Sequence, residues 1–168
     1  SRRFSDHCLL PSSRSGNRRL RFETVEPRQM LTTFYVNGAT GDDGNAGTAA
    51  APFATIQHAI DVADESVTPG DDQIYVFGGR YAENLTIEDD DALTIRGLGA
   101  GVTVEGSGPG DTIDIDNSDV TLEWLSITGS DEDGIDAEGG SLALNFVRVF
   151  GNPDDGIDAE DLTSLSIR

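Results

Sequence analysis

The chain has 168 residues, which is enough for one domain with an additional terminal segment. Its formal net charge is −20, and the basic residues are all arginines, of which seven lie in residues 1–31. Three acidic residues accompany those seven, so residues 1–31 carry +4 and residues 32–168 carry −24. The strong negative charge of residues 32–168 repels nucleic acid and anionic membranes, and we expect neither as a partner. No apolar run approaches the length of a transmembrane helix, so we also expect no transmembrane segment.

Residues 1–33 are rich in Arg and Ser and lack apolar periodicity, which predicts a disordered basic arm. Within this arm, residues 25–31 read VEPRQML. They resemble the LEPR-XLL element of large secreted and surface bacterial proteins, with Val25 and Met30 in place of the usual leucines. The resemblance implies an extracellular or cell-surface location.

A short strand is expected at 34–38, followed by a loop rich in Gly, Asp and Asn. Part of this loop, GDDGNAG at 41–47, superficially resembles a cation-binding loop. It lacks the twelve-residue spacing and terminal Glu of an EF-hand, so we interpret it as a turn. Apolar residues at helical spacing predict an amphipathic helix over 52–63 that begins at Pro52. From about residue 73 the apolar period becomes two, which predicts short strands.

The order of these elements from Tyr35 to Gly106 is similar to the opening of right-handed parallel β-helix proteins of the pectate-lyase-like superfamily. The matching residues are Pro52, Phe53, Thr55, Ile56, Gln57, Ala59, Ile60, Ala63, Gly70, Asp71, Ile74, Val76, Gly79 and Tyr81. The resemblance implies an all-β fold, a right-handed parallel β-helix (solenoid), over residues 34–168. In such a fold residues 52–63 form the N-terminal cap helix.

A repeat of 22 residues supports a solenoid independently, because DGIDAE occurs at both 133–138 and 155–160. Strand alternation directs the Ile and Ala of each copy inward and the acids outward. The outward acids then form two columns, Asp114/Asp136/Asp158 and Asp116/Glu138/Glu160. A third column, Asp111/Asp133/Asp155, is expected at the corner just before this strand. Because the last apolar alternation is incomplete at residue 168, we expect a fragment of a longer protein, truncated at its C-terminus.

Stacked like charges on neighbouring strands are destabilising, so a cation is one explanation for the acidic columns. Calcium prefers carboxylate oxygens, and its expected ligands are Asp133, Asp136, Asp155 and Asp158. The alternative is a solvated acidic face.

The resemblance also implies action on acidic polysaccharides, for which Asp133, Asp154 and Asp155 are the candidate catalytic residues. The chain has no Lys and the repeats have no His, so no base for a lyase is evident and the catalytic set stays unknown. Two hypotheses follow. The first is a secreted or surface carbohydrate-binding or polysaccharide-processing module within a larger protein. The second is a non-catalytic, calcium-binding structural or adhesion module. The oligomeric state is left open.

Trp124 and Phe146 occupy equivalent positions in successive repeats. They share strand parity with the apolar residues before them, which favours stacking in the core. If they are exposed instead, they are expected to form a platform for sugars.

Overall fold

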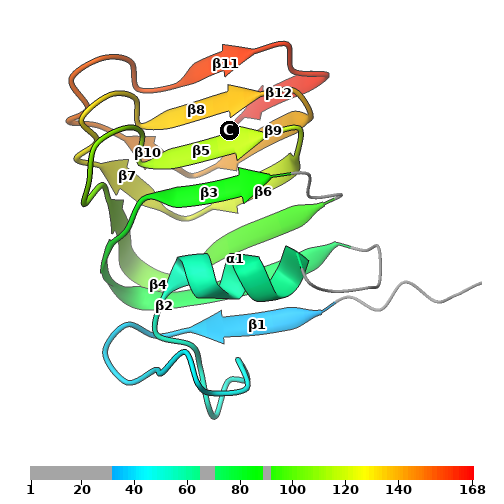
Figure 1. Ribbon diagram of the computed structural model, residues 1–168, viewed down its shortest axis with the longest axis vertical. Coiled ribbons are helices and arrows are strands. Elements are labelled where there is room, and N and C mark those ends of the chain that lie inside the picture. Colours follow the sequence, from blue (N-terminus) through cyan, green and yellow to red (C-terminus); the bar gives the residue numbers. More distant parts are fainter. Residues whose placement is uncertain (1–31, 65–70, 89–91) are drawn as a thin grey trace, which may run out of the picture.

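The computed structural model describes residues 32–64, 71–88 and 92–168. The expected basic arm and the element at 25–31 lie outside these residues. Figure 1 shows coils of strand stacked along one axis, with the helix α1 (Ile56–Asp64) near one end. The strands are β1 (Thr33–Val36), β2 (Asp72–Ala82), β3 (Leu85–Glu88), β4 (Leu93–Glu105), β5 (Ile113–Asp116), β6 (Asp119–Glu123), β7 (Ser126–Thr128), β8 (Ile135–Glu138), β9 (Ser141–Asn145), β10 (Arg148–Val149), β11 (Asp158–Glu160) and β12 (Ser164–Ile167).

Each named strand pairs in parallel with a strand of a neighbouring coil, which confirms the predicted solenoid, and the solenoid has about four coils. One sheet follows the order β1-β2-β4-β6-β9-β12, with β7 paired to β4 and β10 to β7. The second sheet follows the order β3-β5-β8-β11. Ile113 pairs with Ile135, and Asp136 pairs with Asp158, so the predicted 22-residue repeat is the register between coils.

The inward residues form a stacked apolar core, as strand alternation predicts. Ile113, Ile115, Ile135 and Ala137 are buried. In the last coil Ile157 is half-buried and Ala159 is exposed, because this coil has a neighbour on one side only.

The corners between strands use backbone in the left-handed region at repeated positions. Asn117 and Asp161 have φ of 48° and 49°, and Gly139 lies midway between them in sequence with φ of 70°. Trp124 and Phe146 form a second column, each with φ of 57°. A large aromatic residue rarely adopts this conformation, so the second column marks a turn that the fold imposes.

The predicted helix begins four residues later than expected, at Ile56. Phe53 instead pairs with Val36 and exchanges backbone hydrogen bonds with β1 and the residue after it. Thr55 then caps the helix, because its Oγ1 accepts the N–H of His58 at 3.3 Å. The buried face of α1 is as predicted: Ile56, Ala59, Ile60 and Ala63.

Three side chains join the helix to the solenoid. The carboxylate of Glu83 accepts the N–H groups of Ile56 and Gln57, and Asp43 accepts those of Ala54 and Thr55. The segment at 41–47 therefore serves as a turn whose acid supports the helix N-terminus. The Gln57 amide donates to the Thr86 carbonyl at 3.1 Å and accepts its N–H at 2.9 Å, so it satisfies backbone groups of the edge strand β3.

Within the described residues, no helix has the length and hydropathy needed to cross a membrane.

Candidate functional site

The acidic columns predicted from the repeat lie on the outer side of the sheet β3-β5-β8-β11. Asp114 pairs with Asp136 and Asp136 with Asp158, while Glu138 lies between Asp116 and Glu160. Burial, together with the carboxylates of Asp111 and Asp116, raises the pKa of Asp114. Burial also raises the pKa of Asp136, and its acidic neighbours add to the effect. The ionised carboxylates of the column that contains Asp114 and Asp136 therefore lower the stability of the fold at neutral pH.

This cost predicts the effect of Asp136→Asn. A carboxyl whose pKa is raised by folding destabilises the protein above its folded pKa, and the penalty is relieved as the pH falls through that value. Asp136→Asn is therefore expected to raise stability at pH 7 by about 1 kcal/mol, or about 2–4 °C in melting temperature. The gain should shrink as thermal unfolding is repeated at pH values down to about 4.

Asp43→Asn is the contrasting control. Burial raises the pKa of Asp43, but hydrogen bonds from Thr55 and Ala54 outweigh this and leave the pKa lowered. Its ionised form therefore stabilises the fold above the unfolded pKa, and this contribution is lost as the pH falls through the folded pKa. Asp43→Asn should accordingly lower the melting temperature at pH 7. A column variant that destabilised the protein at pH 7 would contradict the electrostatic interpretation.

The corner before each of these strands carries an Asp that has a structural role. Asp111 Oδ1 accepts the N–H of Asp133, and Asp133 Oδ1 accepts the N–H of Asp155, both at 2.6 Å. Each carboxylate therefore binds the backbone of the next coil.

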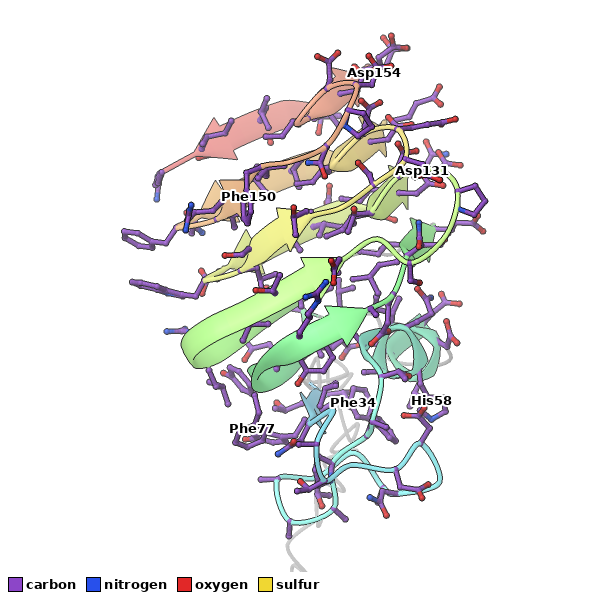
Figure 2. The ribbon with its side chains drawn as sticks, turned by 90° about the vertical axis from the view of Figure 1, so that its left-hand side faces the viewer. Phe34, His58, Phe77, Asp131, Phe150 and Asp154 are labelled. Atoms are coloured by element: carbon purple, nitrogen blue, oxygen red, sulfur yellow. The ribbon has the colours of Figure 1, made fainter. Side chains whose placement is uncertain are left out.

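The acids considered for catalysis do come together. Asp133, Asp154 and Asp155 each place one carboxylate oxygen within 4.8 Å of the others. The expected calcium set is divided: Asp133 and Asp155 lie at this corner, whereas Asp136 and Asp158 lie within the paired strands and outside this group. In Figure 2, Asp131 and Asp154 lie on the opposite side of the solenoid from Phe77 and Phe150.

The expectation that Trp124 and Phe146 stack in the core is wrong. They do stack, with ring centroids 4.3 Å apart and 17° between their planes, but they are 48% and 61% exposed. Their positive φ turns the chain at the corner and breaks the strand alternation. The residue after Trp124, Leu125, is buried in its place.

An open pocket of about 470 Å³ lies beside Trp124; we call it the Trp124 slot. It is lined by Arg96, Gly97, Leu98, Gly99 and Trp124. Gly97 and Gly99 add no side chain, and a Cβ built on Gly99 would meet nothing within 4 Å. The slot therefore places an aromatic ring beside open space, with one cationic side chain at its edge.

Two polar residues support the edge of the slot. Arg96 pairs in register with Glu123, and their side chains form an ion pair with Nη1 and Oε2 3.4 Å apart. Asn145, one coil further, donates from Nδ2 to Glu123 Oε1 at 3.2 Å. Arg96, which lines the slot together with Trp124, is thus paired with an acid that is itself hydrogen-bonded. Small-molecule sites use a few such polar groups beside an apolar surface for orientation.

Comparison with known proteins gives a partial match, to a protein whose name is that of a carbohydrate-active enzyme. No protein-family model matches the chain, and no solved structure matches it. The chain is 33% identical over 91 residues, which is 53% of its length, to Lacto-N-biosidase of Bifidobacterium longum subsp. longum, a glycoside hydrolase. The matched part is 5% of that protein, so the chain spans a small fraction of its relative.

Proposed function

We propose that the chain is a carbohydrate-binding module and that the Trp124 slot is its binding site. The observation that carries the proposal is the indole of Trp124, which is exposed at a corner and borders an open pocket with glycine backbone beside it. The C–H face of a sugar packs well on the negative face of an aromatic ring. An exposed apolar surface with polar groups at its rim is typical of a binding site.

The partial similarity to a glycoside hydrolase supports a carbohydrate ligand. Membership of the pectate-lyase-like superfamily and a secreted or surface location, inferred from the residues at 25–31, belong to the same proposal. A role in polysaccharide processing within a larger protein also stays a prediction, as does catalysis by Asp133, Asp154 and Asp155.

Calorimetric titration with a small panel of sugars tests the binding function. The panel contains lacto-N-biose, cellotriose, β-1,4-galactotriose and trigalacturonate. We expect saturable binding to at least one neutral member, with a Kd in the micromolar to millimolar range, because one aromatic contact and a few hydrogen bonds provide about 4–8 kcal/mol. Absence of binding to every member would overturn the proposal.

Calcium binding at the acidic columns is the alternative function, and the observation that supports it is the closeness of Asp133, Asp154 and Asp155. Calcium should raise the melting temperature of the wild type more than that of Asp133→Asn/Asp155→Asn. An equal shift in both proteins would remove this hypothesis.

A further inference from the structure

We propose that Glu123 makes the Trp124 slot selective for uncharged sugars over sugar acids, an inference that rests on the proposed carbohydrate-binding function. It differs from the expectation, taken from the resemblance, that the substrate is an acidic polysaccharide.

Glu123 is fixed from both neighbouring coils. Its Oε2 lies 3.4 Å from Arg96 Nη1 on one side, and its Oε1 accepts from Asn145 Nδ2 on the other. It directly precedes Trp124 and is less exposed than its partner, with 22% of the side-chain surface accessible against 47% for Arg96. Contacts on both sides limit how far the carboxylate can move away from an incoming anion.

The positive charge of Arg96 in the slot is therefore already neutralised by Glu123. Arg96 contributes the positive charge among the lining residues, and Glu123 offsets it. A sugar carboxylate that approaches Arg96 meets the negative charge of Glu123 or must displace it from Arg96. The −24 charge of residues 32–168 adds a longer-range repulsion, which physiological salt weakens beyond about 8 Å.

A neutral sugar suits the same pair of side chains. Each sugar hydroxyl both donates and accepts hydrogen bonds. Neighbouring hydroxyls can therefore donate to the Glu123 carboxylate and accept from the free N–H groups of Arg96 without breaking the ion pair. Hydrogen bonds with one ionised partner are the stronger class, so this arrangement gains affinity and orients the ring on Trp124.

The test compares the neutral panel sugar that binds most tightly with the same sugar oxidised at C6 to a carboxylate. The wild type is expected to bind the neutral form at least about tenfold more tightly, a difference of about 1.4 kcal/mol. In Glu123→Gln, which keeps the size of the side chain, Arg96 becomes available to the carboxylate. The acidic form should then bind about tenfold more tightly than it binds the wild type, and the preference should disappear.

Glu105→Gln is the matched control. Glu105 forms an ion pair with Arg80, which does not line the slot, whereas the partner of Glu123 is Arg96, which does. Glu105→Gln therefore changes the net charge equally without freeing a cation of the slot. The preference of this variant should match that of the wild type. Equal affinity of the wild type for both sugars, or equal effects of the two substitutions, would overturn the role of Glu123 but leave carbohydrate binding standing. If no panel sugar binds, the proposed function fails and this inference fails with it.

Discussion

Replacing Trp124 with alanine is expected to weaken binding of the neutral panel sugars by at least about tenfold, measured by calorimetry. The substitution removes the aromatic wall of the slot, and an aromatic anchor of this kind typically contributes about 2 kcal/mol or more to a binding site. Trp124 is half exposed and its ring stacks on Phe146, so the fold should persist with a loss of about 0.5–1.5 kcal/mol from the ring pair.

Two further variants show whether the loss arises from the slot. Phe150 is also exposed, at 46%, but it lies beside Arg148 and does not line the slot. Phe150→Ala should bind sugars within about twofold of the wild type, within the small range expected of surface substitutions. Trp124→Phe keeps a ring and should recover part of the affinity. If Phe150→Ala lost as much affinity as Trp124→Ala, the aromatic contact would have to be placed elsewhere on this face.

Replacing Gly140 with alanine is expected to destabilise the solenoid by about 3–5 kcal/mol, from two effects that add. Gly140 has φ of 59°, a conformation that costs an alanine about 1–2 kcal/mol. A Cβ at this position would also lie 2.0 Å from the carbonyl oxygen of Ser118 in the preceding coil. That backbone accepts the N–H of Ser141, so it cannot move without disturbing the ladder between β6 and β9.

Gly110→Ala separates the two effects. Gly110 also has a positive φ, 93°, but a Cβ there would meet nothing within 4 Å. The Gly110→Ala variant should lose only the conformational part of the free energy of unfolding, about 1–2 kcal/mol, measured by urea unfolding. If both alanine variants lost the same stability, the close approach of successive coils at Ser118 and Gly140 would be contradicted.

The repetition in the sequence carried most of the fold prediction. Ile113 and Ile135 occupy equivalent positions, and an alternating strand has one way to bury both, so register and core followed together. The position at which the helix begins could not be predicted from the sequence in this way. Phe53 continues the apolar spacing of α1, yet it pairs with Val36, a contact between distant residues that local periodicity cannot reveal.

The acidic corner was also accessible from the sequence. A regular repeat places Asp133 above Asp155, and Asp154 is its neighbour, so their proximity depends on local geometry alone. The hydrogen bonds that the carboxylates of Asp111 and Asp133 accept from the backbone of the next coil were not foreseen, because those bonds depend on side-chain orientation at a corner.

The aromatic site was missed because strand alternation was extended through a corner. A signal was present: Trp124-Leu125 and Phe146-Val147 are pairs of consecutive apolar residues, and alternation allows only one member of each pair to point inward. These pairs of apolar residues predict an exposed aromatic ring but not the slot beside it. Between Leu98 and Val102 the paired strands β2 and β4 lose register and form a bulge, and Gly99 of this bulge lines the slot together with Trp124. Bulges of this kind depend on pairing between coils.

Collisional quenching of tryptophan fluorescence tests the central claim most directly, because Trp124 is the single tryptophan of the chain. Acrylamide is added to the protein alone and to the protein saturated with the neutral sugar that binds most tightly. We expect efficient quenching of the free protein and marked protection when the sugar is bound. A tryptophan shielded from acrylamide in the free protein, or unchanged quenching in the saturated complex, would contradict it.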